Sequence, residues 1–176
     1  VTEFKNGDPI PEIKSYEEWE TFGMDESAAC CFYNNTIENK NKFGALYNWF
    51  AVADQRGIAP RGWRIPSCSD WEELIQYLGG NKIAGMKLKA SELWMKKENG
   101  ENGNGSNESG FTAYPSGQRN FTGKFNRINL SCSWWASYNE MDKTNWFYYL
   151  DYNSNKIEKG IADLEDGLSI RLIKII

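Results

Sequence analysis

The chemistry open to this chain is limited by the absence of histidine from its sequence. General acid and base steps would fall on carboxylates, lysines or tyrosines, and a nucleophile activated by a Ser–His or Cys–His pair is excluded. Neighbouring carboxylates occur at Glu72 and Glu73, at Glu140 and Asp142, and at Asp163, Glu165 and Asp166. The first pair flanks the apolar stripe of a predicted helix, and the others fall in predicted turns, where solvated charges are the rule. We expect no catalytic residue and no enzymatic activity.

The four cysteines do not have the spacing of a metal site. None forms a CxxC motif, and there is no histidine to complete a zinc site of the usual kind. The acidic run at 163–166 also lacks the ligand spacing and the central glycine of an EF-hand loop. We therefore predict no metal and no cofactor.

Two interpretations of the cysteines stay open. In an oxidising compartment, Cys68 and Cys132 would meet across the fold and form a disulfide. Alternatively, all four cysteines are small buried hydrophobic residues. Cys30 and Cys31 are adjacent in the sequence and are poorly placed to bond each other.

Aromatic residues crowd the span from 134 to 152. Strand alternation puts Trp146, Tyr148, Leu150 and Tyr152 on one face and Phe147, Tyr149 and Asp151 on the other, so one set must face outward or onto another element. Exposed Trp and Tyr are typical of recognition surfaces and sugar-stacking platforms. The alternative is that about half of the cluster, including Trp134, Trp146 and Leu150, is core. The candidate ligand-binding residues are Tyr138, Asn139, Asp142, Asn145, Trp146, Tyr148, Tyr152, Asn153 and Asn155.

The clearest element that must position these residues is a helix that begins after Ser67. Ser67 and Asp70 form a capping-box pattern, and a short strand ends at Pro66. An apolar stripe follows, and Gly79 supplies the positive φ that ends the helix. The stripe consists of Trp71, Leu74, Ile75 and Leu78.

Other elements follow from the same kind of pattern. The stripe of Leu46, Trp49, Phe50 and Ala53 predicts a second helix over 42–53. Residues 1–33 are interpreted as an irregular, wrapping arm with a short helix at 16–19, and the Asn- and Gly-rich stretch 98–107 as an exposed, mobile loop. Strands, joined mostly as antiparallel hairpins, are expected near 117–120, 123–126, 134–137, 146–152, 156–160 and 168–175. Helices followed by strands favour an α+β fold.

Composition narrows the class of protein. The chain has 176 residues, of which 40% are hydrophobic, and we interpret 1–176 as one domain. The formal charge is −4 and the basic residues are scattered, so nucleic acid is not an expected partner. No apolar run approaches the ~18 residues of a membrane helix, so direct membrane insertion is not expected. The first residues lack the pattern of a signal peptide, which we take to be absent from this sequence.

A set of motifs in a fixed order resembles one known family. The motifs are Gly44-Ala45-Leu46-Tyr47-Asn48-Trp49-Phe50-Ala51-Val52, Gly62-Trp63-Arg64-Ile65-Pro66, Asp70-Trp71, Tyr77-Leu78-Gly79-Gly80, Ala84-Gly85-Met86-Lys87-Leu88-Lys89, Asn107-Glu108-Ser109-Gly110-Phe111, Gly117-Gln118-Arg119-Asn120, Trp134-Trp135-Ala136-Ser137 and Gly167-Leu168-Ser169-Ile170-Arg171. Together they resemble the Fibrobacter succinogenes major paralogous domain, from about Asp8 to the C-terminus.

The resemblance implies a C-type-lectin-like fold, with two helices packed on twisted antiparallel sheets with long loops, in an exported or surface-attached bacterial protein. That fold is shared with formylglycine-generating-enzyme-like domains and with variable proteins of diversity-generating retroelements. The chain departs from the calcium signature of C-type lectins, because no proline-containing loop precedes Asn145-Trp146. It also lacks paired cysteines after Cys132, so the resemblance gives no nucleophile for a formylglycine-generating enzyme.

Our leading hypothesis is a non-catalytic extracellular module that binds a glycan or a protein through the surface between Tyr138 and Asn155. The alternatives are a structural or adhesive spacer in a larger bacterial surface protein, and a variable ligand-binding protein of the retroelement type. Arg119 and Arg171 are expected to anchor the sheet by hydrogen bonds to carboxylates or carbonyls rather than to contact a ligand.

Overall fold

The computed structural model describes residues 1–137 and 144–175. Its first half contains α1 (Tyr16–Met24), β1 (Cys30–Phe32), the 3₁₀ turn η1 (Tyr33–Asn35), α2 (Ile37–Phe43), β2 (Ala45–Tyr47), α3 (Trp49–Val52), β3 (Trp63–Arg64), α4 (Cys68–Tyr77) and α5 (Asn81–Leu88). Its second half contains β4 (Ser116–Arg119), β5 (Phe125–Ile128), β6 (Ser131–Trp135), β7 (Trp146–Asp151), β8 (Ile157–Ile161) and β9 (Ile173–Lys174).

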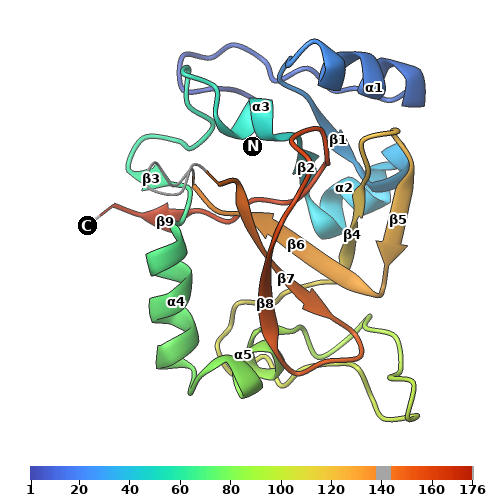
Figure 1. Cartoon of the computed structure of the whole chain (residues 1–176), viewed down its shortest axis with the longest axis vertical. Helices are drawn as coiled ribbons and strands as arrows, with labels where there is room; N and C mark the ends of the chain where they lie inside the picture. Colours follow the sequence, from blue (N-terminus) through green and yellow to red (C-terminus); the bar gives the residue numbers. More distant parts are fainter. Residues whose placement is uncertain (138–143, 176) are drawn as a thin grey trace.

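A five-stranded sheet forms the centre of the molecule, in the order β5-β4-β6-β7-β8 (Figure 1). Its strands pair antiparallel except for β4 and β6, which run parallel. Two short antiparallel ladders, β1-β2 and β3-β9, lie outside it. The α+β class is therefore confirmed. The predicted strand at 168–175 is reduced to Ile173–Lys174, and Leu168 and Ser169 contribute only isolated bridges.

Helices α4 and α5 pack against one face of this sheet and enclose the largest apolar cluster. Ser67 caps α4 as predicted, since its side chain accepts from the backbone of Asp70 and the Asp70 carboxylate accepts from the backbone of Ser67. The predicted stripe then buries Trp71 and Ile75 against β6 and β7. The indole of Trp71 stacks on Trp134, with ring centroids 5.6 Å apart. These contacts show which face of β6 and β7 is covered by α4 and α5, and we call it the inner face of the sheet.

The predicted helix over 42–53 is wrong. Gly44 has a φ of 77°, which ends α2, and the next three residues form β2, which pairs with β1. Asn48 then caps the short helix α3 by accepting from the backbone N–H of Ala51. The apolar spacing over 46–53 suits a continuous helix and also a strand followed by a short helix. The left-handed backbone of Gly44 and the pairing of β2 with β1 select the second arrangement.

The N-terminal segment 1–33 is irregular over 1–14, where it forms only isolated bridges. The predicted short helix extends to Met24 as α1, and the segment also supplies β1. Phe4, Ile10 and Trp19 are buried. The segment is part of the core because its large apolar side chains fill the space between α1 and the β1-β2 ladder.

The stretch at 98–107 is exposed along most of its length, as predicted, but it is tied down at its end. The backbone N–H of Gly105 donates to the carbonyl of Ala90, 2.9 Å away. The Asn104 side chain accepts from the backbone N–H of Trp94 at 3.0 Å. Among residues 1–137 and 144–175, no helix combines the length and apolar character that crossing a bilayer requires.

The predicted disulfide between Cys68 and Cys132 is not present, and no two of the four cysteines, all of which the structure describes, are bonded. Cys132 lies in the middle of the sheet, paired with Gly117 and Leu150, whereas Cys68 begins α4. Both pack into the apolar cluster, which fits the alternative of small buried residues. Burial raises the pKa of the Cys30 and Cys31 thiols to about 12, so these thiols stay protonated.

Candidate ligand-binding site

The predicted ligand-binding residues do not converge on one site. Tyr138, Asn139 and Asp142 lie outside the described residues. Of the others, Asn145 and Trp146 lie at the start of β7, whereas Tyr152, Asn153 and Asn155 follow its end. At that far end, Tyr152 and Asn153 both hydrogen-bond to Glu98, through the Tyr152 hydroxyl and the Asn153 side chain.

Tyr148 belongs to the core and not to a binding surface. It is 2% exposed, and its ring stacks on Trp71 with centroids 5.1 Å apart. Its hydroxyl donates to the backbone carbonyl of Cys68 at 3.3 Å. Burial raises the pKa of this phenol. The same face of β7 also carries Trp146, whose half-buried ring lies 4.3 Å from the Lys159 ammonium.

The side chains of β7 that point away from α4 and α5 are Phe147, Tyr149 and Asp151. These side chains lie on the face of the sheet opposite α4 and α5, where one end is covered by an apolar cluster around Trp49 and Trp135. The uncovered part is hollowed into a cavity of about 470 Å³, which we call the sheet-face cavity. Its walls are Gln118, Arg127, Ser131, Ser133, Phe147, Tyr149, Asp151, Asn153, Ser154 and Glu158.

The register of the sheet brings these side chains together from all five strands. Ser133 of β6 is the direct cross-strand partner of Tyr149, which in turn pairs with Glu158 of β8. Ser131 pairs with Asp151 in the same way. Residues directly opposite on one face have their Cβ atoms about 5 Å apart, so a polar strip forms across the strands.

Two aromatic rings form the floor of one side of the cavity. The centroids of Phe147 and Tyr149 are 5.5 Å apart, with the planes inclined by 32°. The Tyr149 hydroxyl donates to a carboxylate oxygen of Glu158 at 2.6 Å, and this hydrogen bond raises the pKa of Tyr149 to about 12. The ring is therefore held in one orientation and its hydroxyl stays neutral at physiological pH.

A charged pair closes the opposite side. Arg127 pairs with Asp151 and also donates from Nε to the Ser131 hydroxyl at 2.9 Å. The backbone of Arg127 has a φ of 63°, a left-handed conformation that a side chain of this kind rarely adopts. The surrounding hairpin holds the residue in this conformation, and strain of this kind is concentrated at functional positions.

Two polar groups in the cavity have no protein partner. Ser133 is 2% exposed and Gln118 is half-buried, and neither the Ser133 hydroxyl nor the Gln118 amide hydrogen-bonds to any residue in the described part of the chain. Neither is among the fully enclosed polar atoms that lack a partner, so both face the open cavity, where a ligand can replace water. Elsewhere in ranges 1–137 and 144–175, no three acidic or cysteine side chains come together to hold a metal ion.

The model of the family described as Fibrobacter succinogenes major domain matches residues 1–174. The chain belongs to this family. The match confirms the family that the ordered motifs predicted. No curated protein and no solved structure matches the chain.

In this Fibrobacter succinogenes major domain, sequence reasoning chose the inner set of β7 and missed the outer one. A signal was available in β6, where Ser131 and Ser133 alternate with Cys132 and Trp134. Such alternation indicates one apolar and one polar face. Pairing β6 with β7 in register would have placed Tyr149 on the polar face, but that register is set by the fold.

Proposed function

We propose that this domain is a non-catalytic recognition module, with a C-type-lectin-like fold, that binds a neutral glycan in the sheet-face cavity. In this proposal it belongs to an exported or surface-attached bacterial protein. The observation that carries the proposal is the combination of two adjacent aromatic rings, Phe147 and Tyr149, with the unpartnered polar groups of Gln118 and Ser133.

The chemistry of a sugar ring matches this combination. A pyranose offers an apolar C–H face, which packs on an aromatic ring, and a rim of hydroxyls, which both donate and accept hydrogen bonds. Gln118 and Ser133 each supply donors and acceptors. Arg127 and Asp151 compensate each other as an ion pair, and the Glu158 carboxylate accepts a hydrogen bond from the neutral Tyr149 hydroxyl. No cation of the cavity is therefore left over to attract an anion, which favours a neutral ligand over an anionic one. The volume of about 470 Å³ is within the range of small-ligand sites.

The test is a glycan array followed by calorimetry on the best neutral oligosaccharide. Tyr149→Ala removes the stacking ring, and Gln118→Ala removes an unpartnered amide, so each is expected to weaken binding by about tenfold or more. Tyr77→Ala is the matched control, because Tyr77 is 86% exposed on α4 and lies outside the cavity. It should leave the affinity unchanged.

Two results would contradict the proposal. Equal loss in Tyr149→Ala and Tyr77→Ala would show that the cavity is not the site. Absence of binding to any neutral glycan on the array would instead favour a spacer or a protein ligand.

A further inference from the structure

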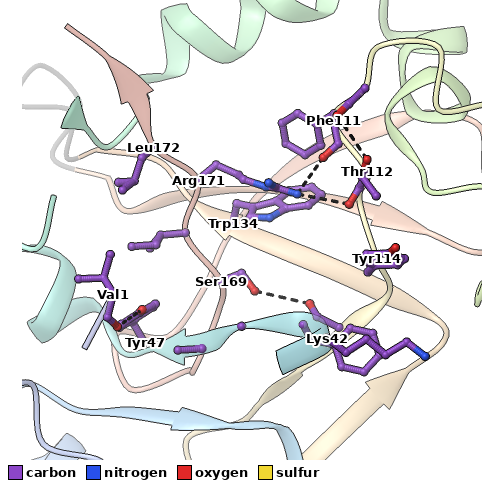
Figure 2. Close-up of a pocket in the computed structure, with 16 residues that line it drawn as sticks. Val1, Lys42, Tyr47, Phe111, Thr112, Tyr114, Trp134, Ser169, Arg171 and Leu172 are labelled. Carbon is purple, nitrogen blue, oxygen red and sulfur yellow. Dashed lines mark hydrogen bonds between the residues drawn. The ribbon is translucent and has the colours of Figure 1, made fainter. Parts of the chain in front are cut away.

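A second and larger cavity lies on the other side of β6 from the sheet-face cavity, between the C-terminal segment and the loop at 110–116 (Figure 2). Its volume is about 700 Å³, and we call it the Arg171 pocket. The end of α2 and the start of β2 form its third wall, and the indole of Trp134 lies in its base. None of the predicted ligand-binding residues that the structure describes lines it.

The guanidinium of Arg171 is incompletely used by the protein. Its Nη2 atom donates to the backbone carbonyls of Phe111 at 3.0 Å and Thr112 at 3.4 Å, and its centre lies 4.4 Å from the Phe111 ring (Figure 2). The Nε and Nη1 atoms carry three of the five N–H donors of an arginine. Neither atom donates to any residue that the structure describes.

The positive charge of Arg171 is also uncompensated. No carboxylate in residues 1–137 or 144–175 forms an ion pair with it. Burial lowers the pKa of this guanidinium, which reflects the cost of keeping the charge away from water. A half-buried cation without a partner is stabilised when an anion arrives, and a carboxylate is the group whose geometry an arginine matches best.

The charged side chains in the walls of the pocket are positive, like Arg171. Its lining includes Arg171 and Lys42 as cations and, among the residues that the structure describes, no acidic side chain, although the whole chain has 24 acidic and 20 basic residues. Lys42 is exposed and also forms no ion pair with a described residue. The local field therefore favours an anionic ligand over a neutral one.

The remaining lining combines hydroxyls with aromatic rings. The hydroxyls of Ser116 and Ser169 face each other at 3.5 Å, and the rings of Phe43 and Tyr114 meet edge to face with centroids 6.4 Å apart. Hydroxyls and rings side by side are suited to a polyhydroxylated ring with an apolar face. A peptide carboxyl terminus would use the cation, but its backbone offers no saturated ring edged with hydroxyls to match this wall.

We propose that the Arg171 pocket binds a carboxylate-bearing sugar, a hexuronic acid unit, with its carboxylate on Arg171. The sugar ring packs against the aromatic wall, and its hydroxyls reach Ser116 and Ser169. This site is separate from the sheet-face cavity, so the domain contacts an acidic glycan through one pocket and a neutral one through the other.

The test measures binding of a panel of oligouronates, each beside the neutral oligosaccharide in which hydroxymethyl replaces the carboxylate. The protein is expected to bind at least one oligouronate about tenfold or more tightly than its neutral counterpart, with the preference falling as salt is added. Arg171→Gln should abolish the preference, and Arg171→Lys should restore part of it. Thermal unfolding of both variants checks that they fold.

Two further comparisons make the result decisive. Lys42→Gln, an exposed substitution, should reduce the preference severalfold without affecting the fold. Tyr149→Ala should leave oligouronate binding unchanged even where it removes neutral glycan binding, which separates this proposal from the function proposed above. The proposal is overturned if acidic and neutral members bind equally, if Arg171→Gln retains the preference, or if a peptide carboxyl terminus binds where no oligouronate does.

Discussion

Arg119 is buried and Arg171 half-buried, each beside aromatic rings, yet the protein surrounds them differently. Arg119 is 0% exposed, and all three of its nitrogen atoms donate to backbone carbonyls, those of Gly123, Ile13, Lys14 and Ser15. Its guanidinium also lies 4.4 Å from the Trp19 ring. Arg171 uses a single nitrogen in this way and presents the rest to a cavity.

The number of backbone carbonyls that a buried cation contacts distinguishes a cation with a structural role from one that is available to a ligand. Lys89 resembles Arg119, since its ammonium donates to the carbonyls of Gly103, Asp151 and Ser154 and lies over the Trp94 ring. In both cases carbonyl dipoles replace the lost water, so the charge joins distant segments of the chain. At Arg171 this replacement is incomplete, and in our proposal a ligand supplies the missing part.

The largest expected effect is at Arg119. Arg119→Gln leaves several buried carbonyls without a donor and disconnects the segment at 13–15 from β4, so we expect a loss of about 3–5 kcal/mol in the free energy of unfolding. Urea denaturation measures it, with the exposed Arg61→Gln as the matched control. A loss as small as that of the control would contradict a structural role.

Lys89→Met comes next. The methionine fills the space but offers no donor to the three carbonyls that hold the ends of the loop at 98–107 and of β7, so about 2–3 kcal/mol should be lost. Lys82→Met, on the exposed side of α5, is the control for the same change of side chain. Equal stability of the two variants would show that the carbonyls find water instead.

Asp166 gives a pH-dependent effect of intermediate size. Burial, followed by the charge of Asp163, raises the pKa of its carboxyl from 3.8 to about 6. The folded state thus binds this proton more tightly than the unfolded chain, so its contribution to stability is present below about pH 4 and is lost as the pH rises through about 6.

Asp166→Asn should remove this loss. Allowing for partial screening by water, we expect the variant to be more stable than the parent by about 1–2 kcal/mol at pH 7, with a smaller difference at pH 4. Unfolding curves across this range measure it. A difference that does not vary with pH would indicate that the effect comes from packing and not from the charge.

The smallest expected effect on stability is at Arg171. Arg171→Gln loses two hydrogen bonds but also removes an uncompensated charge, so the free energy of unfolding should change by less than about 1 kcal/mol. Urea denaturation measures both arginine variants in the same experiment, and a small loss for Arg171→Gln beside a large loss for Arg119→Gln would support the different roles of the two arginines. A comparable loss of stability in the two variants would contradict this difference.

Local patterns in the sequence predicted much of the fold. The capping box at Ser67, the stripe through Trp71 and the strand at 146–152 are each encoded by residues close together in the chain, and the structure contains all three. The helix predicted over 42–53 failed because its spacing suits more than one structure. The choice there was made by β1, a segment that pairs with β2 from outside the window.

The candidate sites were harder to predict. Strand alternation correctly divided β7 into two faces, but it could not say which face α4 and α5 would cover. The inner set was therefore chosen, and Tyr148 proved to be core. The Arg171 pocket was not predicted, because its walls come from residues near 45, 112, 134 and 170. These segments are far apart in the sequence, so no local pattern of residues indicates that they lie close together.

By itself the sequence determined the family, the α+β class, the cap and stripe of α4 and the two faces of β7, since these depend on short-range hydrogen bonding and on the periods of helix and strand. Only the tertiary structure decided which face of the sheet met water and which arginine found a full set of carbonyl acceptors. Both outcomes depend on long-range packing, which assigns solvent and partners to side chains after the local pattern is already satisfied.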